Sequence, residues 1–425
     1  MVPNGWKEGR VKDLISSLDA GVSVNSEDDG NKEAEYKILK TSCVSNGTFD
    51  PFHAKSVYES DEITRLKETV TKDTIIISRM NTPSLVGANS YVENTIENTF
   101  LPDRLWQVKP KKNKVIMRWL GYWFSSDHTR FVLSNLGTGT SGSMKNITKT
   151  DVLDIKINIP PISEQKKIAQ ILSTWDKAIT TTEKLLANSE QQKKALVQQL
   201  LTGKKRFSKL STSFNYTKTR YGTIPADWEH PAIRDICSQI SEKNSTKANY
   251  PVLSCSKYDG FVDSLKYFKK KVYSDDTSAY RLIPRGCFGF PSNHIEEGSI
   301  GLQNSHDFGI VSPIYVVFRA NPNRVNNQYL FALLKTEHYR QIFSAATNAS
   351  VDRRGSLRWD EFSSIHVPLP TIEEQNKIAS TLSLVDQEIK MLKQTLDHLK
   401  QEKKALMQQL LTGKKRVKVA EINNA

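Results

Sequence analysis

The sequence predicts an α+β protein with an internal pseudo-two-fold repeat, in which two mixed α/β domains are joined by two long helices that form an antiparallel coiled coil. Three observations support this prediction. Residues 160–206 recur without a gap as residues 370–416, with about half of the positions identical. The two halves also open alike, with VPNGW at residues 2–6 and IPADW at residues 224–228. Finally, the second repeated segment has apolar residues at coiled-coil spacing.

Each half consists of a variable segment followed by a nearly constant one. Clusters of β-branched residues predict short strands in the variable segments, at residues 73–78, 155–159, 312–318 and 365–369. Helical stretches are expected at residues 115–125 and 328–335, which lie at matching positions of the repeat, so the two variable segments are expected to share a fold. The predicted boundaries are residues 1–159 for the first domain, 160–206 for the central helix, 207–222 for a linker, 223–369 for the second domain, 370–416 for the C-terminal helix and 417–425 for a tail.

The repeated segments are expected to be helices of about 39 residues, or roughly 58 Å at 1.5 Å per residue. Gly203 and Gly413 follow their last leucines and suit left-handed C-caps. The seam of the second helix lapses only at Lys403. Its members are Leu382, Val385, Ile389, Leu392, Leu396, Leu399, Leu406 and Leu410. The first helix has Thr182, Ser189 and Lys193 on its seam, so we expect it to need a partner, and the other copy is the nearest one.

The composition limits the partners and the compartment. The formal net charge of +14 makes a polyanion, either nucleic acid or an anionic membrane, the first partner to consider. The four cysteines show no CxxC spacing, which favours free thiols over disulfides or a zinc ribbon. No signal peptide and no apolar stretch of membrane-spanning length is evident, so we expect a soluble cytoplasmic protein.

Catalytic motifs are not evident. The glycine-rich residues 137–142 lack the GK[ST] ending of a phosphate-binding loop, and no DPPY or NPPY motif of an amino-methyltransferase occurs. A nuclease could use Asp103 with Asp154 and Lys156, but such elements are common by chance. An enzyme that acts alone and a coiled-coil scaffold whose charge serves only assembly therefore stand as the two alternatives to a DNA-binding protein.

Polar loops in the variable segments are the best candidates for binding nucleic acid. Residues 138–146 (TGTSGSMKN) and 347–358 (TNASVDRRGSLR) occupy the same place in the two halves, and a second pair of loops lies at residues 79–82 and 292–294. Small hydroxyl-bearing and cationic side chains suit contacts to phosphates and base edges, although a merely solvated loop is the alternative. The candidate DNA-contacting residues are Arg79, Asn81, Thr138, Thr140, Ser141, Ser143, Lys145, Asn146, Ser292, Asn293, His294, Arg353, Arg354 and Arg358.

The repeated cationic ends at residues 204–206 and 414–416 have three interpretations. They could bind phosphates, neutralise the negative end of the preceding helix, or contact a protein partner. The sequence leaves all three open.

Over nearly its whole length, the chain resembles the specificity subunit of a Type I restriction–modification enzyme. The resemblance rests on PPISEQKKIA with its twin PTIEEQNKIA, on the duplicated ALxQQLLTGKKR helix end and on the VPNGW opening. The stretches NTPSLVG (residues 81–87) and MKNI (residues 144–147) also resemble motifs of target recognition domains. The second half lacks the NTxxLVG stretch, which implies that the two domains recognise different sequences.

The resemblance implies that each variable segment is a target recognition domain for one half of a split, asymmetric site in double-stranded DNA. It further implies that the coiled coil spaces these domains and that the chain is not catalytic and has no metal or cofactor of its own. Two modification subunits would supply S-adenosylmethionine and methylate adenine, and two restriction subunits would use ATP and Mg²⁺. The candidate partner-contacting residues, all in the repeated segments, are Gln165, Gln199, Leu200, Leu201, Gln375, Gln409, Leu410 and Leu411.

Overall fold

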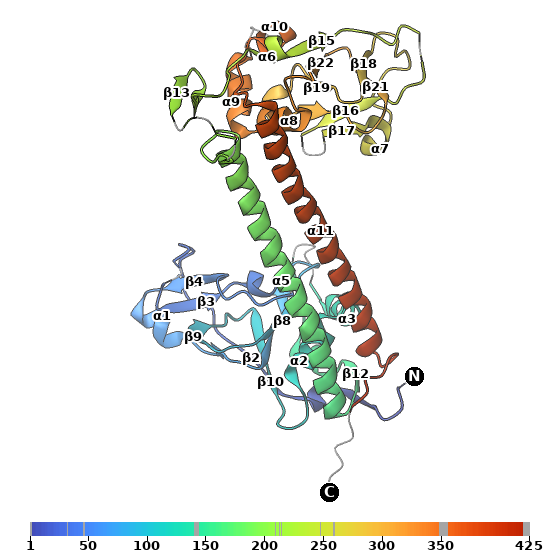
Figure 1. Cartoon of the computed structure of the whole chain (residues 1–425). Helices are drawn as coiled ribbons and strands as arrows, with labels where there is room; N and C mark the ends of the chain where they lie inside the picture. Colours follow the sequence, from blue (N-terminus) through green and yellow to red (C-terminus); the bar gives the residue numbers. More distant parts are fainter. Residues whose placement is uncertain are drawn as a thin grey trace. The chain divides into compact units, whose positions relative to one another are not determined.

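The structure of the chain is a computed structural model. It describes residues 2–31, 33–45, 47–139, 144–208, 210–211, 213, 215–246, 248–257, 260–347 and 356–419. Contacts within the chain divide it into two compact units (Figure 1). Unit 1 comprises Met1–Glu183 and Gln394–Ala425, and unit 2 comprises Lys184–Lys393. Each unit therefore combines one variable segment with parts of both repeated segments.

The repeated segments form two helices of 39 residues each, α5 (Ile162–Leu200) and α11 (Ile372–Leu410). In each unit they lie side by side and run antiparallel (Figure 1). In unit 1, Lys403 near the end of α11 is 2.5 Å from Asp176 near the start of α5. In unit 2, Lys193 near the end of α5 is 2.5 Å from Asp386 near the start of α11. The predicted antiparallel pairing of the two helices is therefore confirmed.

The lapse in the predicted seam at Lys403 is a polar contact with the first domain. Besides its ion pair with Asp176, the Lys403 ammonium lies 5.4 Å from the ring centroid of Tyr122 on helix α2 (Met117–Ser125). The Tyr122 hydroxyl in turn donates to Asp176, and burial together with this carboxylate raises the pKa of Tyr122 to about 12. Polar contacts at seam positions of a coiled coil favour one register, so this partly buried contact disfavours slippage of the helices in unit 1.

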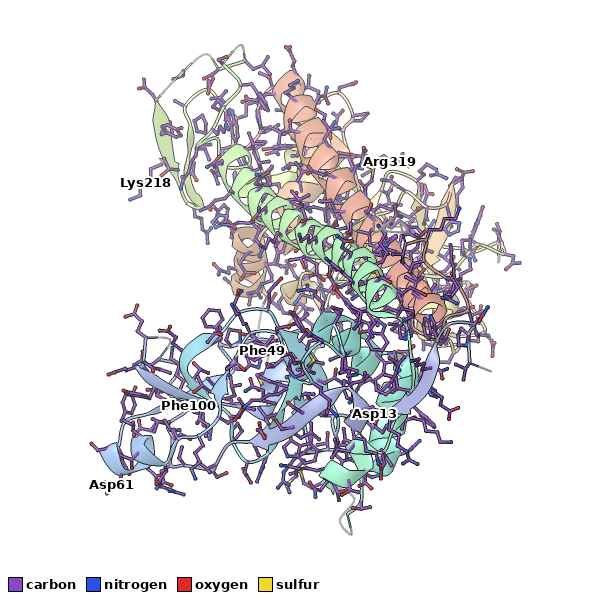
Figure 2. The ribbon with its side chains drawn as sticks, turned by 90° about the horizontal axis from the view of Figure 1, so that it is seen from below. Asp13, Phe49, Asp61, Phe100, Lys218 and Arg319 are labelled. Atoms are coloured by element: carbon purple, nitrogen blue, oxygen red, sulfur yellow. The ribbon has the colours of Figure 1, made fainter. Side chains whose placement is uncertain are left out.

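The domain of unit 1 contains two four-stranded sheets. The first has the strand order β2-β10-β6-β8, with antiparallel neighbours, and packs against helices α2 and α3 (Asp127–Leu136). The second has the order β4-β3-β9-β5. A smaller core is shared by the two sheets, because it contains Ile76 of β6 and Leu105 of β10 as well as Leu39 of β3. Phe49, which Figure 2 labels, packs against this core. The strands of the first sheet are β2 (Ile15–Ala20), β10 (Leu105–Pro110), β6 (Thr74–Ser78) and β8 (Asn89–Val92); those of the second are β4 (Ala54–Val57), β3 (Tyr36–Leu39), β9 (Ile96–Phe100) and β5 (Thr69–Val70).

Unit 1 also contains two separate two-stranded sheets, in which β1 pairs with β12 and β7 pairs with β11. The remaining elements are β1 (Lys7–Arg10), β12 (Lys156–Ile159), β7 (Met80–Asn81), β11 (Lys145–Asn146), the 3-10 helices η1 (Val11–Asp13) and η2 (Thr41–Val44), and helices α1 (Ser60–Arg65), α3 (Asp127–Leu136) and α4 (Lys149–Leu153).

The domain of unit 2 is built around a four-stranded antiparallel sheet in the order β15-β22-β19-β20, with three further strand pairs, β13-β14, β16-β17 and β18-β21. The strands are β13 (Tyr216–Thr219), β14 (Gly222–Pro225), β15 (Cys237–Ile240), β16 (Leu253–Ser256), β17 (Gly260–Asp263), β18 (Arg281–Pro284), β19 (Phe288–Pro291), β20 (Gly301–Leu302), β21 (Phe308–Val311) and β22 (Tyr315–Ala320). The helices are α6 (Ile233–Ile236), α7 (Ser264–Phe268), η3 (Ile295–Glu297), α8 (Asn327–Leu334), α9 (Glu337–Ala346) and α10 (Trp359–Ser363).

The central sheets of the two domains correspond strand by strand, which confirms the predicted repeat. Ser78 of β6 pairs with Leu105 of β10, as Pro291 of β19 pairs with Tyr315 of β22. A pair of helices follows in both cases, α2 and α3 in the first domain and α8 and α9 in the second. The aromatic residues at matching positions of the first helix, Trp119 and Tyr329, are both fully buried.

Two expectations about elements need correction or comment. Residues 365–369 do not form a strand: His366 and Leu369 make only isolated bridges, to Ala232 and Glu229. Pro368 lies between them and has no N–H to donate to a ladder. The segment predicted as a linker, residues 207–222, includes strand β13. The domain boundaries themselves stay predictions.

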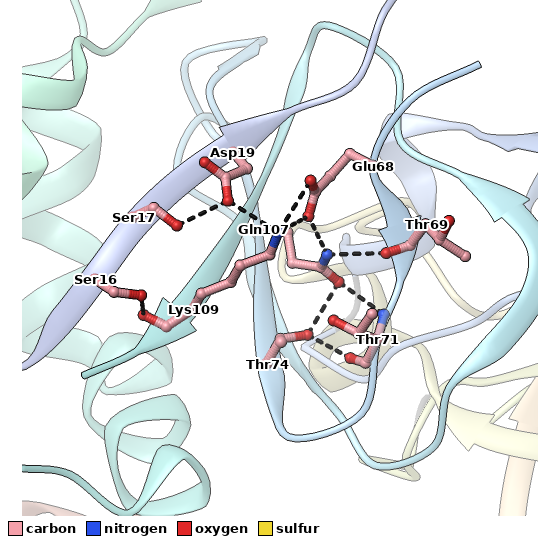
Figure 3. Close-up of polar contacts among 9 residues, drawn as sticks. All are labelled: Ser16, Ser17, Asp19, Glu68, Thr69, Thr71, Thr74, Gln107 and Lys109. Atoms are coloured by element: carbon pink, nitrogen blue, oxygen red, sulfur yellow. Dashed lines mark hydrogen bonds and ion pairs between the residues drawn. The ribbon is translucent and has the colours of Figure 1, made fainter. Parts of the chain in front are cut away.

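A buried amide ties the two sheets of the first domain together (Figure 3). The side chain of Gln107, on β10, is fully buried. Its Nε2 donates to Glu68 and, at 2.9 Å, to the carbonyl of Thr69. Its Oε1 accepts from the Thr71 N–H at 2.9 Å and from the Thr74 hydroxyl at 3.1 Å. Thr69 belongs to β5, a strand of the second sheet, whereas Gln107 belongs to β10 of the first. The buried amide therefore links the two sheets by hydrogen bonds.

Replacing Gln107 by leucine is expected to destabilise unit 1. The Thr69 carbonyl and the Thr71 N–H would lose their side-chain partner, and an unsatisfied buried group costs about 1–3 kcal/mol, so we expect a loss of about 2–4 kcal/mol in the free energy of unfolding. Urea unfolding followed by circular dichroism measures it. The exposed Gln170 on α5 offers a control, because Gln170→Leu should stay within about 0.5 kcal/mol of the parent. Equal stability of the two variants would show that the amide network is dispensable.

Candidate nucleic-acid interface

In the first domain, three segments far apart in the sequence meet just beyond the end of β6. The Arg79 N–H donates to the Arg104 carbonyl at 3.0 Å, at the start of β10. The Arg79 carbonyl accepts from the Ile147 N–H at 2.9 Å, just before α4. Arg79 is thus the point where the loop after β6, the approach to β10 and the approach to α4 are joined.

The second domain repeats this junction with different residues. The Ser292 N–H donates to the Ile314 carbonyl at 3.2 Å, at the approach to β22. The Ser292 carbonyl accepts from the Leu357 N–H at 2.8 Å, shortly before α10. Ser292 therefore corresponds to Arg79. The backbone arrangement is shared, and the side chains that it presents differ.

The structure brings together the described candidates for DNA contact in the first domain. Strand β7 pairs with β11, which places Lys145 opposite Asn81. Thr138 bridges Asn146 through two backbone hydrogen bonds of 2.9 Å. Both loops therefore lie at the Arg79 junction. The candidates Thr140, Ser141 and Ser143 lie outside the described residues.

Several polar groups at this junction are held in place or left without a partner. The guanidinium carbon of Arg79 lies 5.8 Å from the ring centroid of Trp106. Within the described residues, Arg79 Nε and Asn146 Oδ1 are buried atoms without a hydrogen-bond partner. Asn81 is oriented by hydrogen bonds with Ser78 and with the backbone of Thr82. Buried polar atoms are rarely left unsatisfied, so this junction has unused hydrogen-bonding capacity.

In the second domain, two of the candidates line a pocket of about 450 Å³. The candidates are Ser292 and Arg358, whereas Arg353 and Arg354 lie outside the described residues. Asn293 has a buried Oδ1 without a partner in the described part of the chain, and His294 Nδ1 lies 3.3 Å from Glu297 Oε1. The pocket is lined by Gln239, Arg281, Ser292, Pro313, Ile314, Tyr315, Val316, Arg358, Trp359 and Asp360.

The sequence did not indicate a role for Gln239 and Arg281, which line this pocket. It also did not indicate that one arginine in each domain supports a candidate loop. Arg130 on α3 donates to the carbonyls of Val86 and Ser84 at 3.1 and 3.3 Å. Arg340 on α9 donates to the Glu296 carbonyl at 3.0 Å. Arg130 holds the loop after β6, and Arg340 holds the loop after β19. The two arginines occupy matching positions of the repeat, and this match in the sequence could have indicated their shared role.

No cluster of carboxylates supports the nuclease alternative in the described part of the chain. Asp103 accepts a hydrogen bond from Ser23 at 2.6 Å, while Asp154 pairs with Lys12 at 2.9 Å, a contact that lowers the pKa of this carboxyl. Among the described residues, the one group of three potential metal ligands is made of His294, Glu296 and Glu297. It includes neither aspartate.

Six of the eight candidates for partner contact are buried within the chain. Gln165 accepts from the Ile116 N–H and donates to the Pro160 carbonyl, both at 2.9 Å, and Gln375 makes the equivalent bonds with Asn326 and Pro370 at 2.8 Å. These glutamines fasten each helix start to its domain. The buried leucines are Leu200, Leu201, Leu410 and Leu411. Gln199 and Gln409 are the exposed members of the set, and partner contact stays a prediction.

The four cysteines are free thiols, and burial raises the pKa of Cys43, Cys237 and Cys255 to about 12.

Across the part of the chain that the structure describes, every helix is too short or too polar to span a lipid bilayer.

Comparison with known proteins agrees with this architecture. A putative type I restriction enzyme MjaX specificity subunit of Methanocaldococcus jannaschii is 24% identical and aligns over 98% of this chain and 95% of its own length. The type I restriction enzyme MjaVIII specificity subunit of the same organism is 26% identical over 98% of this chain and 94% of its length. The crystal structure of the Type I restriction-modification system S subunit from M. genitalium shares the fold, with a TM-score of 0.58 at 16% identity, over 97% of this chain and 99% of that chain.

The sequence model of one protein family matches both halves of the chain, at residues 3–191 and 225–401, and is described as the Type I restriction modification DNA specificity domain. These matches cover most of the sequence and coincide with the internal repeat. The chain therefore belongs to the family of Type I restriction–modification DNA specificity subunits, and it contains the family's domain twice.

Proposed function

We propose that each domain of this specificity subunit recognises one half of a bipartite, asymmetric site in double-stranded DNA, and that helices α5 and α11 set the spacing between the halves. A specificity subunit provides DNA sequence recognition and is not itself catalytic. The observation that supports the bipartite site is the repeated backbone junction, which presents Arg79 in the first domain and Ser292 in the second.

The side chains around the two junctions differ in ways that would alter base preference. Arg104 of the first domain corresponds to Ile314 of the second, and Thr148, which follows Ile147, corresponds to Arg358. Base edges in the major groove are distinguished by hydrogen-bond donors and acceptors, so domains with one scaffold and different side chains recognise different sequences. Asymmetry of the site follows from this difference.

The charge of the chain supports affinity for the duplex. A net charge of +14 favours contacts to phosphates, which release counterions and make the binding constant fall steeply with salt. The phosphate contacts position the protein on the duplex, and the junction residues provide selectivity.

The proposed assembly follows the family. Two modification subunits would dock on the coiled coil, bind S-adenosylmethionine and methylate adenine, and two restriction subunits would use ATP and Mg²⁺. Gln199 and Gln409, exposed at the repeated helix ends, are the partner-contacting candidates that the structure leaves accessible. No cofactor is proposed for this chain.

Exchanging one domain should change one half of the methylated site. Residues 7–159 would be replaced by those of another family member, with Trp6 kept because its indole N–H bonds Glu164 of α5 at 3.2 Å. Methylated bases would be mapped in genomic DNA from cells that also make the modification subunit. We expect a new sequence in one half-site and the parental sequence in the other.

The reciprocal exchange of residues 229–369 provides the matched control and should change the opposite half-site. It keeps Trp228, the counterpart of Trp6, which bonds Glu374 at 3.1 Å. If either exchange altered both halves together, the domains would not recognise DNA independently.

A further inference from the structure

We propose that the pocket beside α10 in unit 2 binds base edges of the DNA, and that Arg281 and Gln239 determine part of the half-site that the second domain recognises. This inference rests on the proposed function and assigns residues to it. The pocket lies at the Ser292 junction, so it shares its position with the candidates for DNA contact.

The side chains of Arg281 and Gln239 are available for a ligand. Arg281, the first residue of β18, donates from Nε to the Pro313 carbonyl at 3.2 Å. This bond orients the guanidinium, whose terminal N–H groups make no other hydrogen bond within the described part of the chain. Gln239 is exposed on β15, and its amide likewise has no hydrogen-bond partner among the described residues.

The wall of the pocket is held by aromatic packing. The Trp359 ring centroid lies 5.8 Å from that of Phe318 and 6.2 Å from that of Phe362, and both phenylalanines are fully buried. A side chain locked in this way forms a preorganised surface, so little ordering is required when a ligand enters.

The mixture of charges in the pocket favours base edges over phosphate. The lining contains two arginines and an amide, but also the carboxylate of Asp360, which would repel a phosphate. Base edges present both acceptors and donors: arginine pairs with O6 and N7 of guanine, glutamine with adenine, and a carboxylate accepts from the amino group of cytosine. The residues around this pocket therefore fit bases in the major groove.

The first domain provides an independent observation. Trp106 pairs with Ile77 as Val316 pairs with Phe290, so Trp106 corresponds to Val316 in the lining of the pocket. The guanidinium of Arg79 lies over Trp106 at 5.8 Å. In both domains an arginine therefore accompanies this strand position, Arg79 over Trp106 in the first and Arg281 in the same pocket as Val316 in the second.

The test is Arg281→Met in the full chain, produced with the modification subunit. The methylated site is first mapped for the parent, and methylation is then measured on duplexes in which each base pair of that site is changed singly. We expect preference at one or two positions of a single half-site to fall by about tenfold or more, because a bidentate base contact discriminates by this order. The other half-site should be unaffected.

Arg285→Met is the matched control. Arg285 follows the same strand, is exposed and lies outside the pocket lining, where it pairs with Asp307 at 3.0 Å. It should leave the preference unchanged. Gln239→Leu is a second test variant that removes no hydrogen bond of the described chain, so it remains informative if Arg281→Met does not fold.

Two results would overturn the inference. A uniform loss of methylation across all duplexes, with a weaker dependence on salt, would show that Arg281 contacts a phosphate. Unchanged preference in both Arg281→Met and Gln239→Leu would place the pocket outside the interface. A parent complex that methylates without any sequence preference would instead refute the proposed function itself.

Discussion

Replacing Arg206 by methionine is expected to lower the free energy of unfolding of unit 2 by about 3–5 kcal/mol, because it breaks a buried ion pair by removing one partner. Arg206 Nε donates to Glu374 Oε1 at 2.6 Å, and a second nitrogen is 2.9 Å from Asp227. The Glu374 side chain is only 1% exposed and the Arg206 side chain 10%. Without the guanidinium, the carboxylate would keep only the Trp228 indole N–H, at 3.1 Å, as its side-chain donor.

The chain contains its own comparison for this variant. Arg416 makes the equivalent contact in unit 1, with Nε donating to Glu164 at 2.9 Å, but its side chain is 39% exposed. Solvent screens an exposed pair, so Arg416→Met should cost less stability than Arg206→Met. Urea unfolding of both variants, monitored by tryptophan fluorescence, measures the difference. Equal losses would show that burial does not set the strength of these contacts.

These contacts give a role to residues whose function the sequence left open. From the sequence, the cationic residues 204–206 and 414–416 could bind phosphates, neutralise the negative end of the preceding helix, or contact a protein partner. In the structure, the last arginine of each end binds a glutamate in the first turn of the other helix. The similar openings of the two halves are explained as well, since each contributes the tryptophan that bonds this glutamate. Pairing residues so far apart in the sequence requires the register of the antiparallel helices, which no local pattern provides.

The long helices and the repeat could be predicted because their signals are local. Heptad spacing and duplicated segments are visible in the sequence without knowledge of any distant contact. The site depends on distant contacts. Asn81 and Lys145 were predicted separately, and only the pairing of β7 with β11 shows that they are neighbours.

Arg281 and Gln239 were missed because they lie on strands, and sequence reasoning sought DNA contacts in loops. Their place in the pocket depends on the pairing of β18 with β21 and of β15 with β22. Each register is a long-range property, and a shift by one residue would turn both side chains to the opposite face. Polar residues on strands flanking a loop are therefore candidates that a search of loops alone does not find.

Lengthening both helices by four residues should lengthen the unspecified gap in the DNA site by one to two base pairs. Four residues add about 6 Å to a helix, close to the rise of two base pairs, and rotate its end by a net of about 40°. One base pair turns DNA by about 35°. Length and rotation therefore both favour a slightly longer gap. The insertions would duplicate residues 184–187 in α5 and 394–397 in α11, where the two units divide.

The insertion must be matched because ion pairs join the helices on both sides of this point. Glu183 is 2.8 Å from Lys400, and Glu190 is 2.9 Å from Lys393. Duplicating residues in α5 alone would move these partners out of register, so we expect loss of stability rather than a longer gap. Mapping methylated sites in cells measures the gap for each variant, and a matched insertion that left it unchanged would show that the helices do not set the spacing.

A seven-residue insertion in both helices separates the effect of rotation from that of length. It adds about 10.5 Å, near the rise of three base pairs, but rotates the helix end by only about −20°. Three base pairs turn the duplex by roughly 105°, so the lengthened helices could not present both domains to their half-sites on an undistorted duplex. We expect the four-residue variant to methylate a new site and the seven-residue variant to lose methylation. Activity of both variants, with gaps that follow helix length alone, would mean that the domains rotate freely on the helices.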